Sequence, residues 1–290
     1  MTGILIGESQ PGDVTPGDMT IVMLYRVYRA ALHLPRYLGH YRITTFLRRL
    51  MVPGVAVVDH GCLMQLDPQE WLQIGMMTIG GIEPKTSSLF RKLLRPGDTY
   101  VDVGAHVGYH ALLARQVVGA TGRVLAVEPQ PYNCNKILIN AALNGFSNIT
   151  TIVGAAGDRD GVLTLRDQAP HDKSRLTVRG AGKNDQNVEF EVPAWTLDTL
   201  VRRQKIDKVR LLKIDVEGHE LAVLKGALPI LAHTENVIFE DAMDMPTQAS
   251  AEIRELLLRG GFTLVGVTGE AWNGGPTPEN NVWARRQHDD

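Results

Sequence analysis

The feature that most constrains this fold is a regular alternation of short apolar runs and amphipathic stretches, which starts at position 99 of a 290-residue chain. It predicts three strands and two helices in the chain order 99–103, 108–118, 123–127, 131–144 and 149–153. Strands joined through helices pair in parallel, because the crossover returns the chain to the same end of the sheet. We therefore expect an α/β fold with a mostly parallel central sheet.

The alternation resumes after an interruption whose runs, GVLTLRD and VEFEVPAW, are typical of hairpin strands. It continues with strand VRLLKID, helix EGHELAVLKGA, strand NVIFED, a helix over 247–259, and strands near 262–267 and 281–285. These elements extend the expected sheet almost to the end of the chain.

Upstream of position 96 the pattern is less regular and predicts a separate accessory region. The expected elements are a helix over 21–34, a helix over 37–50, a small hairpin layer over 55–82 and a helix over 85–94. Residues 1–18 combine Gly, Pro, Ser, Thr and Asp without periodicity, which is typical of a flexible leader. With the turn RPGD as the boundary, we expect a leader over 1–18, a helical and hairpin accessory region over 19–95 and a catalytic domain over 96–290.

The charge and the cysteine content exclude several classes of function. A formal net charge of −2 and an isoelectric point near 6.5 provide no overall positive field for a polyanion, so no nucleic-acid partner is expected.

Cys62 and Cys134 lack the spacing of a CxxC pair or a zinc knuckle, and we expect free thiols in a reducing compartment. There is no run of about 18 apolar residues and no basic leader, which predicts a soluble, cytoplasmic protein without a transmembrane segment.

A series of arginines marks the two helices expected near the start of the chain. They are Arg26, Arg29, Arg36, Arg42, Arg48 and Arg49. Such a series is compatible with a membrane surface or an anionic substrate, but a solvated helix face is the favoured interpretation.

The stretch VDVGAHVGYH, from Val101 to His110, has the form of a turn that binds a nucleotide cofactor. Gly104 and Gly108 allow a tight turn and a close backbone approach, and the helix that follows offers free amides. Asp102 stands where a GxGxxG fingerprint has its first glycine, and its carboxylate would repel a diphosphate. The motif therefore favours S-adenosylmethionine, which has a sulfonium and an ammonium group and no phosphate, over the alternative of NAD.

Glu128 ends the next predicted strand, 24 positions after Gly104. This separation is near the spacing of about 20 at which an acidic residue binds ribose hydroxyls in nucleotide-binding folds. The two signals together predict a cofactor site at the carboxyl edge of the sheet.

Four motifs resemble, in order, those of FkbM-type S-adenosylmethionine-dependent methyltransferases: TYVDVGAHVGYHALLA, VLAVEPQPYNCNKILINAALNG, VPAWTLDTL and VRLLKIDVEGHELAVLKGA. The resemblance covers about residues 80–270 and implies a Rossmann-like class I methyltransferase fold. It implies that Asp102, Gly104, Ala105, His106 and Gly108 bind the methionine end, Glu128 and Asn133 the ribose, and Ala156 and Asp158 the adenine, with Asp215 as a further cofactor contact. It also implies O-methylation of a sugar or another hydroxyl-bearing natural product.

Acidic and imidazole groups follow the strands VRLLKI and NVIFE at the same predicted edge. His219 is the expected general base, because an ordinary histidine pKa of about 6.5 leaves the ring neutral near physiological pH. Asp215 and Glu240 are further catalytic candidates, although Asp215 has an alternative role as the N-cap of the next helix. Asp215 with Glu240 or Asp241 would also offer oxygen ligands to Mg2+.

Several alternatives to this function remain open or are poorly matched. A nucleic-acid adenine methyltransferase needs a [DN]PP[YF]-like clamp after the fourth strand, where this chain has DVEGHE. The expected partner is a small hydroxylated acceptor, a sugar or secondary metabolite, and a homodimer is a candidate assembly. N-methylation of a small molecule and a non-catalytic cofactor-fold binding or scaffold protein remain as alternatives.

Overall fold

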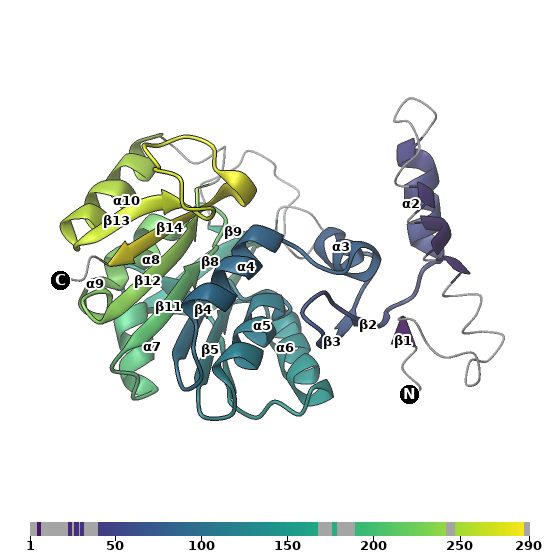
Figure 1. Ribbon diagram of the computed structural model, residues 1–290, viewed down its shortest axis with the longest axis horizontal. Coiled ribbons are helices and arrows are strands. Elements are labelled where there is room, and N and C mark those ends of the chain that lie inside the picture. Colours follow the sequence, from purple (N-terminus) through teal and green to yellow (C-terminus); the bar gives the residue numbers. More distant parts are fainter. Residues whose placement is uncertain are drawn as a thin grey trace. The chain divides into compact units, whose positions relative to one another are not determined.

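The computed structural model divides into two compact units, Met1–Ile82 with His171–Ser174, and Glu83–Pro170 with Arg175–Asp290 (Figure 1). The residues that it describes are 5–6, 23–24, 26–28, 30–31, 40–167, 176–178, 189–241 and 247–286. Apart from Leu5–Ile6, the leader expected over 1–18 lies outside the described residues. The division falls at Glu83, ahead of the predicted boundary at the RPGD turn.

The first unit contains a three-stranded sheet and short helices. Its sheet has the order β1 (Leu5–Ile6), β2 (Gly54–Val57) and β3 (Leu63–Leu66), with β1 parallel and β3 antiparallel to β2. Its helices include α2 (His40–Leu50) and α3 (Trp71–Ile79). Of the helix expected over 21–34, the described residues 23–24, 26–28 and 30–31 are helical, and the others lie outside the described part.

Helix α3 corrects the expectation of a hairpin layer over the whole of 55–82. Its sequence, WLQIGMMTI, is apolar nearly all round, so it has no helical periodicity that would separate it from a strand. It ends at Gly80, which has the left-handed φ of 99° and donates its amide to Met76 O at 3.0 Å. The hairpin itself, β2 with β3, is as predicted.

The second unit is organised around a seven-stranded sheet. Its order is β13 (Phe262–Gly266), β14 (Asn281–Arg286), β12 (Thr234–Glu240), β11 (Val209–Ile214), β4 (Thr99–Val103), β5 (Arg123–Glu128) and β6 (Ile149–Val153). Only β14 among these strands runs antiparallel to its neighbours. This is the strand order of a Rossmann-like class I methyltransferase, so the predicted fold class is confirmed.

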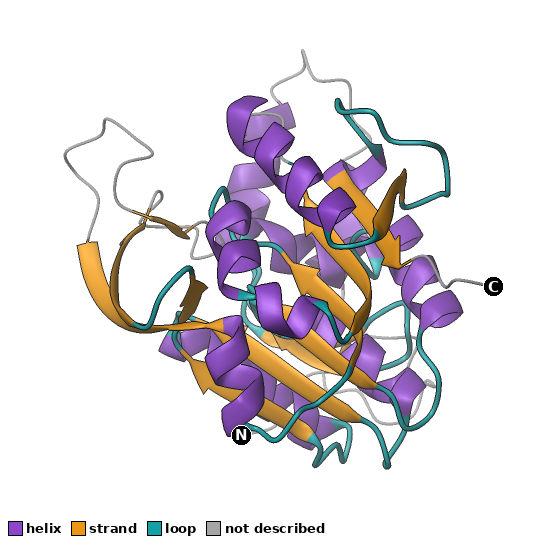
Figure 2. Cartoon of the chain, turned by 90° about the vertical axis from the view of Figure 1, so that its left-hand side faces the viewer, coloured by secondary structure: helices purple, strands orange, loops and turns teal. Residues whose placement is uncertain are grey.

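Helices cover both faces of this sheet (Figure 2). One group contains α4 (Pro84–Leu93), α5 (Tyr109–Val118) and α6 (Pro131–Leu143), and the other contains α7 (Leu197–Arg203), α8 (Glu220–Gly226), α9 (Leu228–Leu231) and α10 (Thr247–Arg259). The chain moves from β4 to β5 and β6 in one direction along the sheet, and β11 and β12 lie in the other direction. Because the crossovers are right-handed in both directions, the connecting helices lie on opposite faces. Since α4 packs on α5, it belongs with the larger unit rather than with the accessory region.

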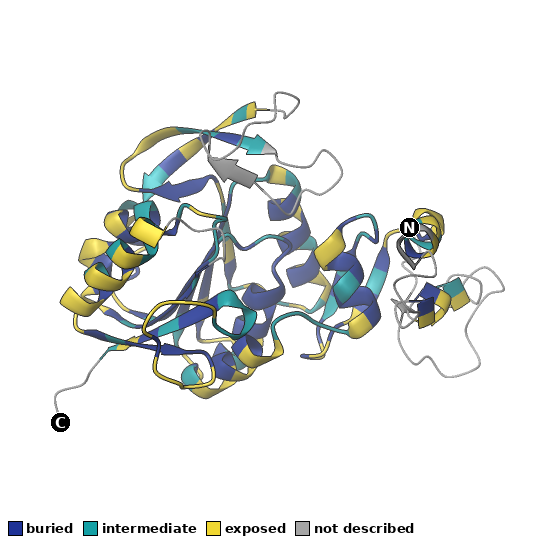
Figure 3. Cartoon of the chain, turned by 90° about the horizontal axis from the view of Figure 1, so that it is seen from above, coloured by how far each residue is buried: buried dark blue, intermediate teal, exposed yellow. Residues whose placement is uncertain are grey.

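The sheet and the inner faces of the helices form the core, while the outer helix faces are exposed (Figure 3). Strand β4 shows why: its last four residues are buried, as expected for a central parallel strand covered on both sides. Cys62 and Cys134 are buried free thiols, which confirms that part of the prediction.

A second sheet holds the predicted hairpin strands. Its order is β7 (Ala155–Gly157), β10 (Glu189–Thr196), β8 (Gly161–Asp167) and β9 (Leu176–Val178), and a 3-10 turn, η1 (Pro278–Asn280), precedes β14. Strands β8 and β10 pair in antiparallel fashion, as expected, while β7 pairs in parallel with β10.

Helix α8 approaches β7 closely at Gly226. A Cβ on Gly226 would lie 2.0 Å from the carbonyl oxygen of Gly157 and 3.3 Å from Cα of Thr196. Only glycine permits this approach, which fixes α8 against the strand that follows β6.

We therefore expect Gly226→Ala to lower the free energy of unfolding by about 2 kcal/mol or more, because backbone must move to make room for the methyl group. Gly75 in α3 is a matched control, since it is also a helical glycine and has nothing within 4 Å of its Cβ position. Gly75→Ala is expected to stabilise by about 0.5–1 kcal/mol. Urea unfolding followed by circular dichroism measures both, and an unchanged midpoint for Gly226→Ala would contradict the close approach.

Candidate functional site

The loops that follow the central strands meet at the carboxyl edge of the seven-stranded sheet. The amide of Asp215 donates to Val103 O at 2.9 Å, and the amide of Gly104 donates to Val127 O at 2.9 Å. These backbone bonds continue the pairing of β4 with β11 and β5 beyond the strand ends. The loops predicted to bind the cofactor are therefore held side by side.

Gly104 and Gly108 have the structural roles that the motif predicts. Gly104 has φ of 87°, and a Cβ there would lie 1.8 Å from the carbonyl oxygen of Asp215. Gly108 has φ of 88° and precedes the first residue of α5, Tyr109. Both positions need the left-handed conformation that glycine adopts at little cost.

Asp102 lies inside β4, one residue before the strand ends, and its side chain is buried. Its Oδ2 accepts no hydrogen bond from the described residues, although the Tyr100 hydroxyl interacts with the same carboxyl group. Burial raises the pKa of Asp102 to about 6, against the lowering effects of the nearby Lys213 cation and of Tyr100. A buried carboxylate oxygen without a partner fits a site that receives a cationic or hydrogen-donating ligand.

Glu128, at the end of β5, is buried and accepts three hydrogen bonds. Its carboxylate receives the amides of His106 and Gln130, each at 2.9 Å, and the side-chain amide of Asn133 at 3.1 Å. Burial nevertheless raises its pKa to about 7. The structure thus brings three predicted cofactor residues, Glu128, Asn133 and His106, into one hydrogen-bonded group.

The residues assigned to adenine lie on and beside β7. Ala156 is buried in that strand, whereas the side chain of Asp158 is half-exposed in the turn after it. In the same turn Asp160 accepts the amide of Thr196 at 2.8 Å. Asp158 lies 4.0 Å from Nε of Arg159.

His219 lies near the same turn. A Cβ on Gly157 would lie 3.5 Å from Nε2 of His219, and the charge of Asp158 acts on the ring. Burial lowers the pKa of His219 despite Asp158, so the ring is neutral at pH 7. A neutral ring can accept a proton, as the base hypothesis requires, but its described neighbours are those of the predicted adenine side.

Lys213 occupies the centre of the acidic group and was not identified from the sequence. It is buried in β11, and its Nζ donates to Asp215 Oδ2 at 2.6 Å and lies 4.0 Å from Glu83 Oε2. Burial alone would lower the pKa of Lys213, but the charges of Asp215, Glu83 and Asp102 raise it. A lysine within the apolar strand VRLLKI was the signal that could have revealed it.

Glu83 is a second residue that the sequence did not reveal. Its carboxylate accepts a hydrogen bond from the side-chain amide of Asn281 at 3.0 Å and lies 3.5 Å from His110 Nε2. Burial raises its pKa to about 7, although Lys213 opposes that shift. No local pattern marks this glutamate, because its partners come from distant parts of the chain.

Asp215 and Glu240 form a coupled carboxyl pair joined by a hydrogen bond. Burial would raise the pKa of Asp215, but the Lys213 cation lowers it. Burial and the charges of Asp215 and Glu217 raise the pKa of Glu240 to about 9. At pH 7 the pair therefore consists of a charged aspartate and a protonated glutamate.

The alternative role of Asp215 as a helix cap is not supported by this geometry. Helix α8 begins at Glu220 with His219 at the N-cap position, so the expectation that Asp215 caps this helix is wrong. Glu220 instead fixes the loop, because its Oε1 accepts the amides of Val216 at 3.0 Å and Gly218 at 3.2 Å.

The expected Mg2+ ligands are not assembled. Within the described ranges, no three or more His, Cys, Asp or Glu side chains are grouped so that they could hold a metal ion. The Lys213 ammonium already occupies the position next to Asp215 that a cation would take. Asp241 hydrogen-bonds to Ser250 and lines a different space.

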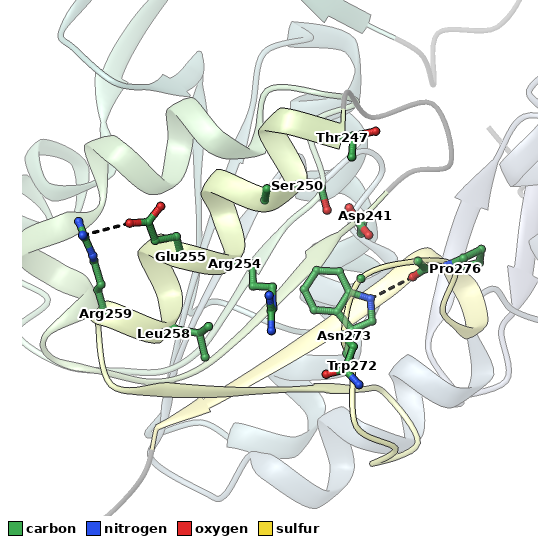
Figure 4. A pocket seen from close by; sticks show the side chains of 13 residues that line it. Asp241, Thr247, Ser250, Arg254, Glu255, Leu258, Arg259, Trp272, Asn273 and Pro276 are labelled. Carbon is green, nitrogen blue, oxygen red and sulfur yellow. Dashed lines mark hydrogen bonds and ion pairs between the residues drawn. The ribbon is translucent and has the colours of Figure 1, made fainter.

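That space is an open pocket of about 770 Å³ between α10 and the loop that joins β13 to β14 (Figure 4). Its walls include Asp241, Ser250, Arg254, Trp272 and Asn273. The Trp272 indole donates to Gly275 O at 3.0 Å and packs edge-on against Phe239, which holds the loop in place. The pocket lining includes Asp241, the residue that follows β12, and extends along α10 as far as Arg259.

Comparison with known proteins matches residues 102–264, more than half of the chain, to the methyltransferase FkbM domain. The chain is similar to hexuronic acid methyltransferase AglP of Haloferax volcanii, with 27% identity over 49% of this chain and 55% of that protein. It is also similar to methyltransferase sdnD of Sordaria araneosa, with 29% identity over 64% of this chain and 81% of that protein.

Other relatives match over shorter stretches. Protein-L-isoaspartate O-methyltransferase 2 of Archaeoglobus fulgidus is 33% identical over 29% of this chain, and the match spans only 36% of that protein's length. Among solved structures, an FkbM methyltransferase from Methylobacillus flagellatus matches with a TM-score of 0.46 and 18% identity, over 94% of this chain and 63% of that one. The match to the domain family, which begins at Asp102 and includes both buried carboxylates of the cofactor loops, shows that this chain belongs to the FkbM methyltransferase domain family.

Proposed function

We propose that this protein is an S-adenosylmethionine-dependent O-methyltransferase that acts on a hydroxyl group of a sugar or another small natural product. The observation that carries the proposal is the buried carboxylate Asp102, which has an oxygen without a partner beside the Gly104 turn. Such a carboxylate fits the ammonium and sulfonium groups of this cofactor and would repel a diphosphate. Glu128, at the end of the neighbouring strand, fits the ribose hydroxyls.

The residues present fit this cofactor in three parts. Asp102 and the backbone of 104–108 would hold its methionine end, Glu128 and Asn133 its ribose, and Ala156 with Asp158 its adenine. The cofactor supplies a methyl group on a positively charged sulfur, which is already activated for displacement. The protein therefore has to align the acceptor hydroxyl with the methyl group, exclude water and accept one proton.

The Asp215–Glu240 pair is suited to hold the acceptor hydroxyl and accept its proton. Asp215 is the charged member, so it accepts the hydrogen bond and then the proton of the hydroxyl, while Glu240, which is already protonated, holds Asp215 through its own hydrogen bond. Lys213 keeps Asp215 oriented through the 2.6 Å bond. His219 is the alternative base, because burial keeps its ring neutral at pH 7.

The pocket beside α10 is the best candidate for the acceptor. Asp241 in its wall directly follows Glu240, so the pocket and the carboxyl pair lie at the same strand end. Its charged and amide side chains, Arg254 and Asn273 among them, suit a polar, hydroxylated molecule. The similarity to a hexuronic acid methyltransferase and to methyltransferase sdnD supports a sugar or natural-product acceptor.

The activity itself is tested by incubating the full chain with S-adenosylmethionine and a panel of uronic acids, neutral sugars, polyols and amines. Release of S-adenosylhomocysteine that depends on a hydroxylated acceptor, with the methyl group found on oxygen by NMR, is expected. Transfer to amines alone would replace O-methylation by N-methylation. Binding of NADH in preference to S-adenosylmethionine would overturn the cofactor assignment.

For cofactor affinity, Glu128→Gln is expected to weaken S-adenosylmethionine binding about 10- to 100-fold, because hydrogen bonds to a charged group are lost. Isothermal titration calorimetry measures the change. Glu191→Gln, at an exposed position of β10, is the control and should bind as the unchanged protein does. Equal affinities of all three proteins would remove Glu128 from the ribose site.

Cofactor binding is also expected to depend on pH. Burial raises the pKa of Asp102 to about 6 and of Glu128 to about 7 in the free protein. A cationic ligand favours the charged carboxylates and so lowers both pKa values on binding; affinity must then rise with pH through this range and become constant above about pH 8.

Calorimetry in buffers of different ionisation enthalpy should show proton release near pH 6.5. S-adenosylhomocysteine, which lacks the sulfonium charge, is the matched ligand and should show a weaker dependence. Identical pH profiles for the two ligands would mean that the sulfonium charge does not change the pKa of these carboxylates.

For turnover, Asp215→Asn is expected to lower kcat by about 10² to 10⁴ and to change cofactor affinity less, because the charged proton acceptor is lost. Glu240→Gln is expected to lower kcat less than Asp215→Asn does, because Glu240 is already protonated at pH 7 and only its hydrogen bond to Asp215 is altered. His219→Ala discriminates between the two candidate bases. If His219 is the base, its loss should lower kcat as much as Asp215→Asn does. If His219 only lies beside the adenine, its loss should change mainly the KM for the cofactor. Initial rates at saturating acceptor measure all three. Unchanged kcat in every variant would leave alignment alone as the source of catalysis.

A further inference from the structure

The positive charges of this chain are unevenly distributed. Between positions 19 and 58 the sequence contains six arginines and no aspartate or glutamate. All 32 acidic residues, and only 24 of the 30 basic ones, lie outside this segment. A short, purely basic segment in an otherwise acidic protein indicates an anionic partner that the remainder of the chain would not attract.

Exposed apolar side chains are concentrated in the same part of the molecule. Of the 16 large hydrophobic side chains exposed in the described residues, ten lie before position 83. They are Met23, Val27, Ile43, Phe46, Leu50, Val52, Val57, Trp71, Leu72 and Ile79. Concentrated apolar exposure of this kind marks an interaction surface, whereas single exposed residues do not.

Helix α2 shows how this surface is built. Ile43, Phe46 and Leu50 are spaced three and four residues apart, so they share one helix face, and they are 40%, 61% and 52% exposed. The helix turns a different face to its own unit: Thr44 is buried, and the guanidinium of Arg48 lies 4.4 Å from the centre of the Trp71 ring. Within the described part of the unit, this apolar face therefore stays largely exposed.

Basic residues accompany this apolar face. Arg49 is exposed and adjoins Leu50, and Arg26 is exposed on the preceding helical segment together with Met23 and Val27. An exposed apolar stripe with arginines beside it and no acidic residue nearby in the sequence has the composition of a helix that lies in a membrane interface.

We propose that α2 and the helical residues before it dock this protein on the surface of an anionic lipid bilayer. Ile43, Phe46 and Leu50 enter the boundary between headgroups and acyl chains, and the arginines pair with lipid phosphates. The helix lies along the surface, since α2 has 11 residues and no described helix has the length and apolar character needed to cross a bilayer. The inference is independent of the methyl acceptor.

The charge favours a bilayer over a second copy of the chain. A symmetric contact through α2 would place the arginine-rich segments of two copies against each other, with no acidic residue in either segment to compensate. Anionic headgroups neutralise the same charges. An anionic bilayer therefore covers the apolar face and neutralises the positive charges at the same time.

The test is co-sedimentation of the full chain with vesicles of phosphatidylcholine alone or with about one third phosphatidylserine. Binding is expected only to the anionic vesicles and should decrease when salt is raised, because salt screens the arginines. Arg49→Gln should weaken binding about five-fold. Equal binding to both vesicle types would overturn the proposal.

A triple variant, Ile43→Ser with Phe46→Ser and Leu50→Ser, separates apolar insertion from charge alone. It is expected to bind at least about ten-fold more weakly. The matched control carries Leu138→Ser and Leu143→Ser, two leucines exposed on α6, and should bind like the unchanged protein. Circular dichroism and retained S-adenosylmethionine binding show that the variants fold.

Two further results would overturn the membrane assignment. The triple variant binding vesicles as tightly as the unchanged protein would show that the apolar face does not insert. A dimer of the unchanged protein in size-exclusion chromatography with light scattering, lost in the triple variant and accompanied by no vesicle binding, would assign the face to a second copy.

Discussion

The interaction on which the site depends is the burial of the Lys213 ammonium group among the carboxylates of Asp215, Asp102 and Glu83. A charge in a protein interior is tolerated only when opposite charges surround it, and removal of one partner leaves a costly uncompensated charge. Strands β4 and β11 must therefore stay paired in the register that places Asp102 opposite Lys213. The segment before α4 must also bring Glu83 to the same position.

Protonation limits the negative charge at this acidic edge. Burial raises the pKa of Asp102, Glu83, Glu128 and Glu240, so part of their charge is removed by protons near neutral pH. The remaining negative charge lies next to Lys213, on Asp215. In the proposed function, a positively charged cofactor would favour the charged carboxylates and so release these protons. Burial and neighbouring charges give Asp215 and Glu240 different protonation states.

Backbone contacts give this site its geometry. Gly104 allows the loop after β4 to touch the carbonyl oxygen of Asp215, and Glu128 ties the amide of His106 to the end of β5. The cofactor loop is thereby fixed on one side by a close contact and on the other by a hydrogen bond. Helix α8, held against β7 at Gly226, positions His219 and the loop that Glu220 organises. In the other unit, Ile43, Phe46 and Leu50 on one face of α2 remain exposed.

The sequence by itself determined the order of the strands and helices from 99 onward, the glycine turn and the acidic strand end at Glu128, because periodicity, turn chemistry and chain spacing are local properties. It did not predict α3, whose apolar residues have no period, or the partners of Lys213, whose carboxylates come from separate elements. Only the tertiary structure decided that Asp215 pairs with Lys213 and Glu240 rather than capping α8, and that Asp241 faces another pocket. The physical reason is that protonation and pairing depend on distances and burial, which are set only when segments far apart in the sequence pack together.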